Sequence, residues 1–146
     1  MTPPLPLWRV LIAISVAMAC ALLLMPVFTL LPRLIFWGGP FGPAFAIFIA
    51  PVIGLFVGAF IAPMSVLLAA LALSATTFGL SALGRTQAFA GRWWAWALAG
   101  LATGAATGAA LALEIQTWGF DLPDTAYSGA ATGLICALIA RRIARV

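Results

Sequence analysis

The chain has 146 residues, of which 65% are hydrophobic and 7% are charged, with seven arginines against three acids. Ordinary soluble domains are about 45–50% apolar and about 25% charged, so this composition excludes a soluble domain and predicts an integral membrane protein. The sequence contains no histidine and no lysine. It therefore excludes catalysis, metal binding and haem ligation through histidine, and Schiff-base chemistry through lysine. We expect no catalytic residue, no metal and no other cofactor.

The first expected membrane-spanning helix covers residues 10–32, an uncharged run between Arg9 and Arg33. A helix needs roughly 20 residues to cross about 30 Å of hydrocarbon, so this run forms one crossing. The run contains Cys20, and Cys136 lies in another apolar run near the end of the chain. Cysteines at such positions usually behave as small buried hydrophobic residues, so we expect no disulfide between them.

The uncharged run 34–84 is long enough for two crossings. Its glycine- and proline-rich stretch at 38–43 cannot continue a regular helix, because glycine is too flexible and proline lacks a backbone donor. We expect a helix over 44–61 with a proline kink, then a tight turn, then a second helix over 65–83. The alternative is a single helix that is kinked at Pro63 and preceded by a re-entrant segment.

Two further helices are expected over 93–117 and 125–141. Tryptophans mark both ends of the first, as expected for rings that favour the two headgroup layers. The second is short, but the reach of Arg141 toward the surface makes it adequate, and Asp124 is expected to cap its start. We therefore expect residues 1–146 to form a single all-α domain. Its expected architecture is a polytopic integral membrane helical bundle. Five transmembrane helices are expected, with four helices plus a re-entrant segment as the alternative.

The arginines predict the orientation of the bundle, because cytoplasmic loops of membrane proteins carry an excess of positive charge. In both arrangements the loop that holds Arg85 and Arg92 lies on the same side as the C-terminal arginines. We expect this side, with the C-terminus, to be cytoplasmic and the acidic loop 119–124 to lie on the opposite side. Arg33 joins the cytoplasmic side if there are five crossings, and Arg9 joins it if there are four. The alanine- and arginine-rich composition favours a bacterial inner membrane.

Glycines at four-residue spacing form the strongest pattern in the sequence. In lipid, such rows let two helix backbones approach closely and gain dispersion contacts. We expect the last two predicted helices to pack through these rows as an antiparallel hairpin. The alternative is a face that binds a second copy of the chain or another membrane subunit. The glycines concerned are Gly54, Gly58, Gly100, Gly104, Gly108, Gly129 and Gly133.

Polar residues follow the same predicted hairpin. At about 100° per residue, Thr103, Thr107 and Glu114 lie on one face of their helix and are candidates for a polar path. The competing interpretation is that the hydroxyls bond to their own helix carbonyls and that the carboxylate lies in the headgroup layer. Glu114 also forms, with Asp121 and Asp124, a candidate acidic mouth that attracts cations or a basic partner.

These features favour a non-catalytic accessory, scaffold or assembly subunit that packs through glycine-rich helices against other membrane subunits or a second copy of itself. The alternative is a small oligomeric channel or transporter component with a polar path along the fourth helix. The expected environment is the lipid bilayer. Seven scattered arginines form no basic face, so no nucleic-acid partner is expected.

Overall fold

The computed structural model describes residues 7–36 and 42–144, and all regular structure in these ranges is helical. Five α-helices occur there, with one five-residue π-helical segment, η1, and one 3-10 helical turn, η2. The bounds are α1 Leu7–Phe36, α2 Gly42–Phe56, η1 Val57–Ile61, α3 Pro63–Thr86, α4 Trp93–Glu114, η2 Gln116–Trp118 and α5 Leu122–Ala144. The predicted all-α fold class is confirmed.

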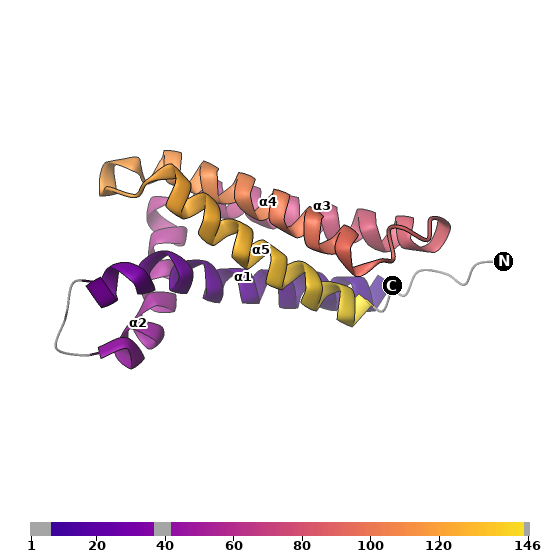
Figure 1. Cartoon of the computed structure of the whole chain (residues 1–146), viewed down its shortest axis with the longest axis horizontal. Helices are drawn as coiled ribbons and strands as arrows, with labels where there is room; N and C mark the ends of the chain where they lie inside the picture. Colours follow the sequence, from indigo (N-terminus) through magenta and orange to yellow (C-terminus); the bar gives the residue numbers. More distant parts are fainter. Residues whose placement is uncertain (1–6, 37–41, 145–146) are drawn as a thin grey trace.

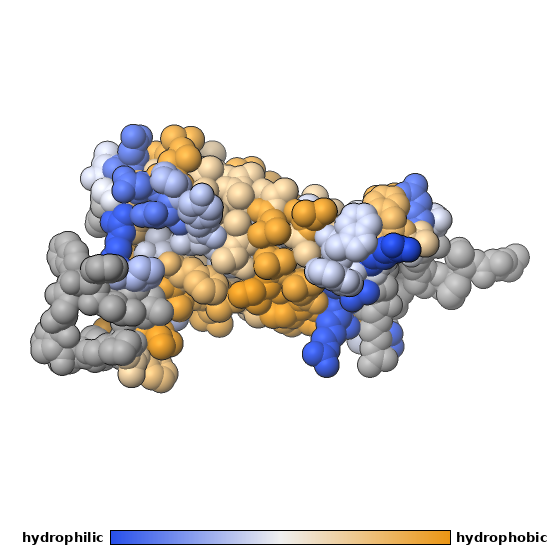
Figure 2. All heavy atoms as spheres, viewed as in Figure 1, coloured by the Kyte–Doolittle hydropathy of each residue, from blue (hydrophilic) through white to orange (hydrophobic). Residues whose placement is uncertain are grey.

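Large apolar side chains are exposed along the middle of the bundle. In the part of the chain that the structure describes, three helices are long and apolar enough to cross a membrane, within Leu7–Leu30, Pro63–Gly84 and Trp93–Glu114. Figure 2 shows hydrophobic side chains between two ends at which hydrophilic side chains gather. Helices satisfy their own backbone hydrogen bonds, so a surface of this kind is suited to lipid. The chain is a polytopic membrane protein, as its composition predicts.

The tightest helix pair is the antiparallel hairpin of α4 and α5, and α1 packs along α5 (Figure 1). Ala13 of α1, Cys136 and Ala140 of α5 and Trp96 of α4 belong to one buried cluster. Cys20 packs against this cluster, and both cysteines are free thiols. The small side chains of α1 and α5 allow these two helices to lie close together around the large indole.

α2 does not run the length of the bundle. At the end of α1, the Arg33 guanidinium donates to the Gly119 carbonyl oxygen at 2.8 Å. At the start of α3, the Ser65 amide donates to the Glu114 carboxylate at 2.9 Å. Both acceptors lie at the α4–α5 turn, so α2 begins and ends at this one end of the bundle, where it lies crosswise (Figure 1). Four helices, α1, α3, α4 and α5, run the length of the bundle.

The five predicted helices are present, but the placement of the second one differs from the five-crossing prediction. As in the alternative, four long helices are present and the short α2 lies at one end of the bundle, but Pro63 begins α3 and does not kink a longer helix. α2 has 15 residues, fewer than the roughly 20 that a crossing needs. After η1 the chain bends at Ala62, which has non-helical φ −128° and ψ 49°, and Pro63 starts α3 because it needs no N–H partner.

The start of the last helix also differs from the prediction. α5 begins at Leu122, so Asp124 lies in its first turn and not at the capping position. The residues 38–41, within the stretch expected to interrupt helical structure, lie outside the described residues.

Candidate functional site

The glycine rows of α4 and α5 close the hairpin between these two helices. A Cβ atom built at Gly104 would overlap the carbonyl oxygen of Gly129, and one built at Gly100 would overlap that of Gly133. The contact is reciprocal, since a Cβ on either glycine of α5 would overlap a carbonyl oxygen of α4. Any side chain at these positions would push the two backbones apart, so only glycine fits.

The three remaining glycines of the predicted interface also pack within the chain. Gly108 faces the backbone of Thr125 near the turn end of the hairpin. Gly54 of α2 faces the ring of Pro26 on α1, and Gly58 of η1 faces the first turn of α3. The structure therefore uses all seven glycines for contacts between helices of one chain.

The hydroxyls of the predicted polar path are bonded within their own helices. Thr103 donates to the Ala99 carbonyl oxygen, and Thr107 donates to the Thr103 carbonyl oxygen at 3.0 Å. On α5, Thr132 donates to the Ser128 carbonyl oxygen at 2.8 Å. Hydroxyls bonded in this way need neither water nor a neighbouring chain as a partner.

Glu114, the last residue of α4, caps the start of α3. Its Oε2 accepts the backbone N–H of Ser65 at 2.9 Å and also accepts the Ser65 hydroxyl. Ser65 is the third residue of α3, so its N–H has no carbonyl partner within the helix, and Ala62 before the helix supplies no side-chain cap. The helix dipole also favours a carboxylate at this position. Glu114 thereby fastens α3 to α4 at one end of the bundle.

Asp121 and Asp124 are exposed at the same end. Their backbone carbonyl oxygens accept the hydroxyls of Thr125 and Ser128 at 2.7 and 2.8 Å, while Glu114 is directed toward α3. Within residues 7–36 and 42–144, no group of three or more histidine, cysteine or acidic residues is placed to hold a metal ion. The three acids of the predicted mouth share one end of the bundle but do not converge on one site.

Arg33 lies beside these acids, at the opposite end of the bundle from the C-terminal arginines. Its guanidinium stacks 4.3 Å from the centre of the Phe120 ring and donates to the Gly119 carbonyl oxygen. No salt bridge joins Arg33 to an acid in the part of the chain that the structure describes. Because a guanidinium has five N–H donors, several of them have no acidic partner here.

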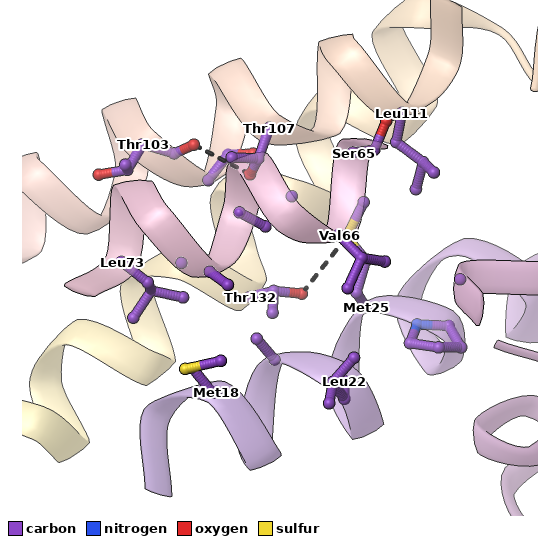
Figure 3. Close-up of a pocket in the computed structure, with 18 of the residues that line it drawn as sticks. Met18, Leu22, Met25, Ser65, Val66, Leu73, Thr103, Thr107, Leu111 and Thr132 are labelled. Carbon is purple, nitrogen blue, oxygen red and sulfur yellow. Dashed lines mark hydrogen bonds between the residues drawn. The ribbon is translucent and has the colours of Figure 1, made fainter. Parts of the chain in front are cut away.

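A cavity of about 330 Å³ lies along α3, between this helix and α1, α4 and α5, and residues of α2 and η1 also line it. Met18, Leu22 and Met25 of α1 and Val66 and Leu73 of α3 line it (Figure 3). Small residues and back-bonded threonines complete its wall, so the surface that it presents is almost wholly apolar. The cavity extends along α3, between the end where Glu114 fastens that helix and the buried indole at the start of α4.

Sequence reasoning missed this cavity because residues of all five α-helices and of η1 build it. The available signal is small residues on two facing helices, such as Ala69 and Ala70 on α3 and Ala99 on α4. Two such faces either close on each other, as α4 and α5 do, or leave a space, as α3 does. The choice depends on how each helix is held at its ends, and this is not a local property of the sequence.

Comparison of the chain with protein-family models, with curated proteins and with solved structures finds no match. The site combines a hairpin in backbone contact, an apolar cavity beneath α3 and a carboxylate that fastens α3 at one end. These features suit the packing of helices and the binding of apolar groups.

Proposed function

We propose that this chain is a non-catalytic accessory, scaffold or assembly subunit of a larger membrane complex. The observation that supports the proposal is the outer face of α3, where Met64, Leu67, Leu71 and Phe78 are 50% to 71% exposed. The apolar window of α3 is 11% buried, whereas that of α4 is 33% buried. Close packing drives helix association in lipid, so a spanning helix this sparsely packed gains from a second protein surface.

Contacts at its two ends hold α3 in place and leave its outer face free. Glu114 fastens its first turn. The loop after α3 is held by Arg141, whose guanidinium donates to the Gly91 carbonyl oxygen at 2.9 and 3.1 Å, and by Trp96, whose indole N–H donates to the Ala90 carbonyl oxygen at 2.9 Å. A helix supported at its ends presents a fixed surface, which favours a role in assembly.

Because the glycine rows are used inside the α4–α5 hairpin, the proposal places partner contact on α3 and not on the rows themselves. The alternative of an oligomeric channel has less support. The hydroxyls of Thr103 and Thr107 are bonded within α4, and the cavity is apolar. Measurement of ion flux through reconstituted vesicles distinguishes the two functions. A channel component gives ion flux when it is reconstituted alone, and an accessory subunit does not.

The proposal includes an orientation. Arg9, Arg92 and Arg141 lie at one end of the bundle, and Arg33 lies at the other. By the positive-inside rule, the end with more arginines and the C-terminus faces the cytoplasm. The turn 119–124 then faces the opposite side, and a bacterial inner membrane is the proposed location.

Copurification of the full-length chain in mild detergent tests the proposed function. The variant Leu67→Ala/Leu71→Ala truncates the outer face of α3, and Leu98→Ala/Leu113→Ala truncates two leucines of α4 that are 58% and 65% exposed. We expect the wild type and the α4 variant to retain a defined partner at a fixed ratio. The α3 variant should lose about tenfold in retention, which corresponds to about 1.4 kcal/mol of lost contact.

Two outcomes would contradict this proposal. One is a wild-type chain that purifies without a protein partner. The other is equal loss of the partner by the α3 variant and the α4 variant, since the contact would then not be specific to α3. Ion flux through vesicles that contain only the purified chain would support the channel in its place.

A further inference from the structure

The cavity beneath α3 has the place and the length of a lipid acyl chain. It is flanked by α1, α3 and α4, each of which is long and apolar enough to cross a membrane. Its lining runs along α3 from Ser65 to Leu80. At 1.5 Å per residue this is about 22 Å, and the hydrocarbon of one leaflet is about 15 Å thick. A chain that enters from one surface of the membrane therefore fits along the cavity.

The wall of the cavity selects for an apolar occupant. Thr29 of α1 and Thr76 of α3 line it, and they donate to the Met25 and Ala72 carbonyl oxygens of their own helices, each at 2.8 Å. With these hydroxyls already bonded, little in the wall attracts water, so the wall favours an apolar occupant. In a bilayer, the most abundant apolar molecule is the lipid itself.

Arg33 supplies a charged group at one end of this cavity. Thr29 lies four residues before it, on the same face of α1, and lines the cavity. The Arg33 guanidinium stacks on Phe120, which also lines the cavity. One of its N–H groups is used by Gly119, and no acid within the described ranges pairs with it. A planar guanidinium without an acidic partner in the described ranges matches the oxygens of a phosphate group.

We propose that the chain binds one anionic phospholipid, with an acyl chain in the cavity beneath α3 and the phosphate group on Arg33. The apolar wall and the guanidinium lie next to each other, so a molecule with both an acyl chain and a phosphate contacts both at once. The lipid belongs to the leaflet at the α4–α5 turn. This site is independent of the proposed accessory function, since the outer face of α3 is not part of it.

Native mass spectrometry of the purified full-length chain, exchanged into phosphatidylglycerol or phosphatidylcholine, tests the site. The wild type should retain one phosphatidylglycerol per chain in preference to phosphatidylcholine. Arg33→Gln should reduce retention of phosphatidylglycerol about tenfold, as expected for loss of a charge-assisted contact. Arg92→Gln, at the other end of the bundle, should leave it unchanged.

A second pair of variants tests the position of the acyl chain. Ala70→Leu extends a side chain into the cavity and should reduce retention of both lipids, whereas Ala75→Leu, on the exposed side of the same helix, should not. Leu22→Trp narrows the cavity from α1 and gives the same test if Ala70→Leu does not fold. Thermal unfolding in detergent checks that each variant is folded.

Three results would overturn the proposal. Wild-type retention by a folded cavity variant would place the acyl chain elsewhere. Unchanged retention of phosphatidylglycerol by Arg33→Gln would show that this side chain does not hold the phosphate. Displacement of the lipid by excess inorganic phosphate alone would identify a site for a free anion and not for a lipid.

Discussion

At the scale of single residues, two features hold the bundle together. Glycines let α4 and α5 touch through their backbones, and Glu114 caps α3. The glycines could be identified from the sequence, because a four-residue spacing is visible without knowledge of the fold. The partner of Glu114 could not be identified, because Ser65 is 49 residues away and no periodicity connects the two. The same carboxylate therefore suggested an acidic mouth with Asp121 and Asp124.

The hairpin contact predicts a contrast between two glycine-to-alanine variants. Gly104→Ala should lower the free energy of unfolding by about 1–3 kcal/mol, because the new methyl group meets the Gly129 backbone. Gly79→Ala on α3 meets nothing within 4 Å and should raise that free energy by up to about 1 kcal/mol through helix propensity. Unfolding in detergent micelles measures both. Equal effects would show that α4 and α5 are not in backbone contact.

The cap on α3 predicts a local change in protection. Glu114→Ala should lower the free energy of unfolding by about 1–2 kcal/mol, because the Ser65 N–H loses its acceptor. Hydrogen exchange of the amides at 64–66 should become faster in this variant. Asp121→Ala, which removes an exposed carboxylate at the same end, should leave that exchange unchanged. If the exchange of these amides is the same in Glu114→Ala as in the wild type, the Glu114–Ser65 hydrogen bond does not cap α3.

At the scale of elements, the existence of the helices could be predicted more fully than their placement. Long uncharged runs identify α1 and α4, and punctuation by glycine and proline separates α2 from its neighbours. The direction of α2 could not be read from hydropathy, because 44–61 is as apolar as a crossing helix. Contacts on either side of α2 show that it does not cross the bundle. Arg33 before α2 and Ser65 after it both bond to residues at the α4–α5 turn.

The placement of α2 predicts which sites are accessible from each side of the membrane. Ala44→Cys, in the first turn of α2, should react with a membrane-impermeant thiol reagent from the same side as Gln116→Cys in the α4–α5 turn. Gln87→Cys, after α3, should react only from the other side. All three positions are exposed, and the test uses a chain in which both native cysteines are replaced by alanine. Reaction of Ala44→Cys from the side of Gln87→Cys would instead indicate five crossings.

At the scale of the whole molecule, the bundle has a closely packed part and an open part. α1, α4 and α5 share the buried cluster around Trp96, whereas α3 contributes the partly buried Leu73 and Leu80 beside it and borders the cavity along its inner side. This division could not be predicted, because alanine and glycine are abundant on all of these helices. It has two consequences: the inner side of α3 has room for a lipid chain, and its outer side is exposed to a partner. If the purified wild-type chain retains lipid but no protein partner, this result would support the lipid site and contradict the accessory function.

Native mass spectrometry of complexes released directly from membranes tests the proposed accessory function most directly, because it reports partners, copy number and bound lipid together. The wild type is predicted to appear with a second membrane subunit at a defined ratio. Leu67→Ala/Leu71→Ala should appear as a single chain, while Leu98→Ala/Leu113→Ala should keep the partner. A wild-type chain found at its own mass, alone or with lipid only, would contradict the assignment as an accessory subunit.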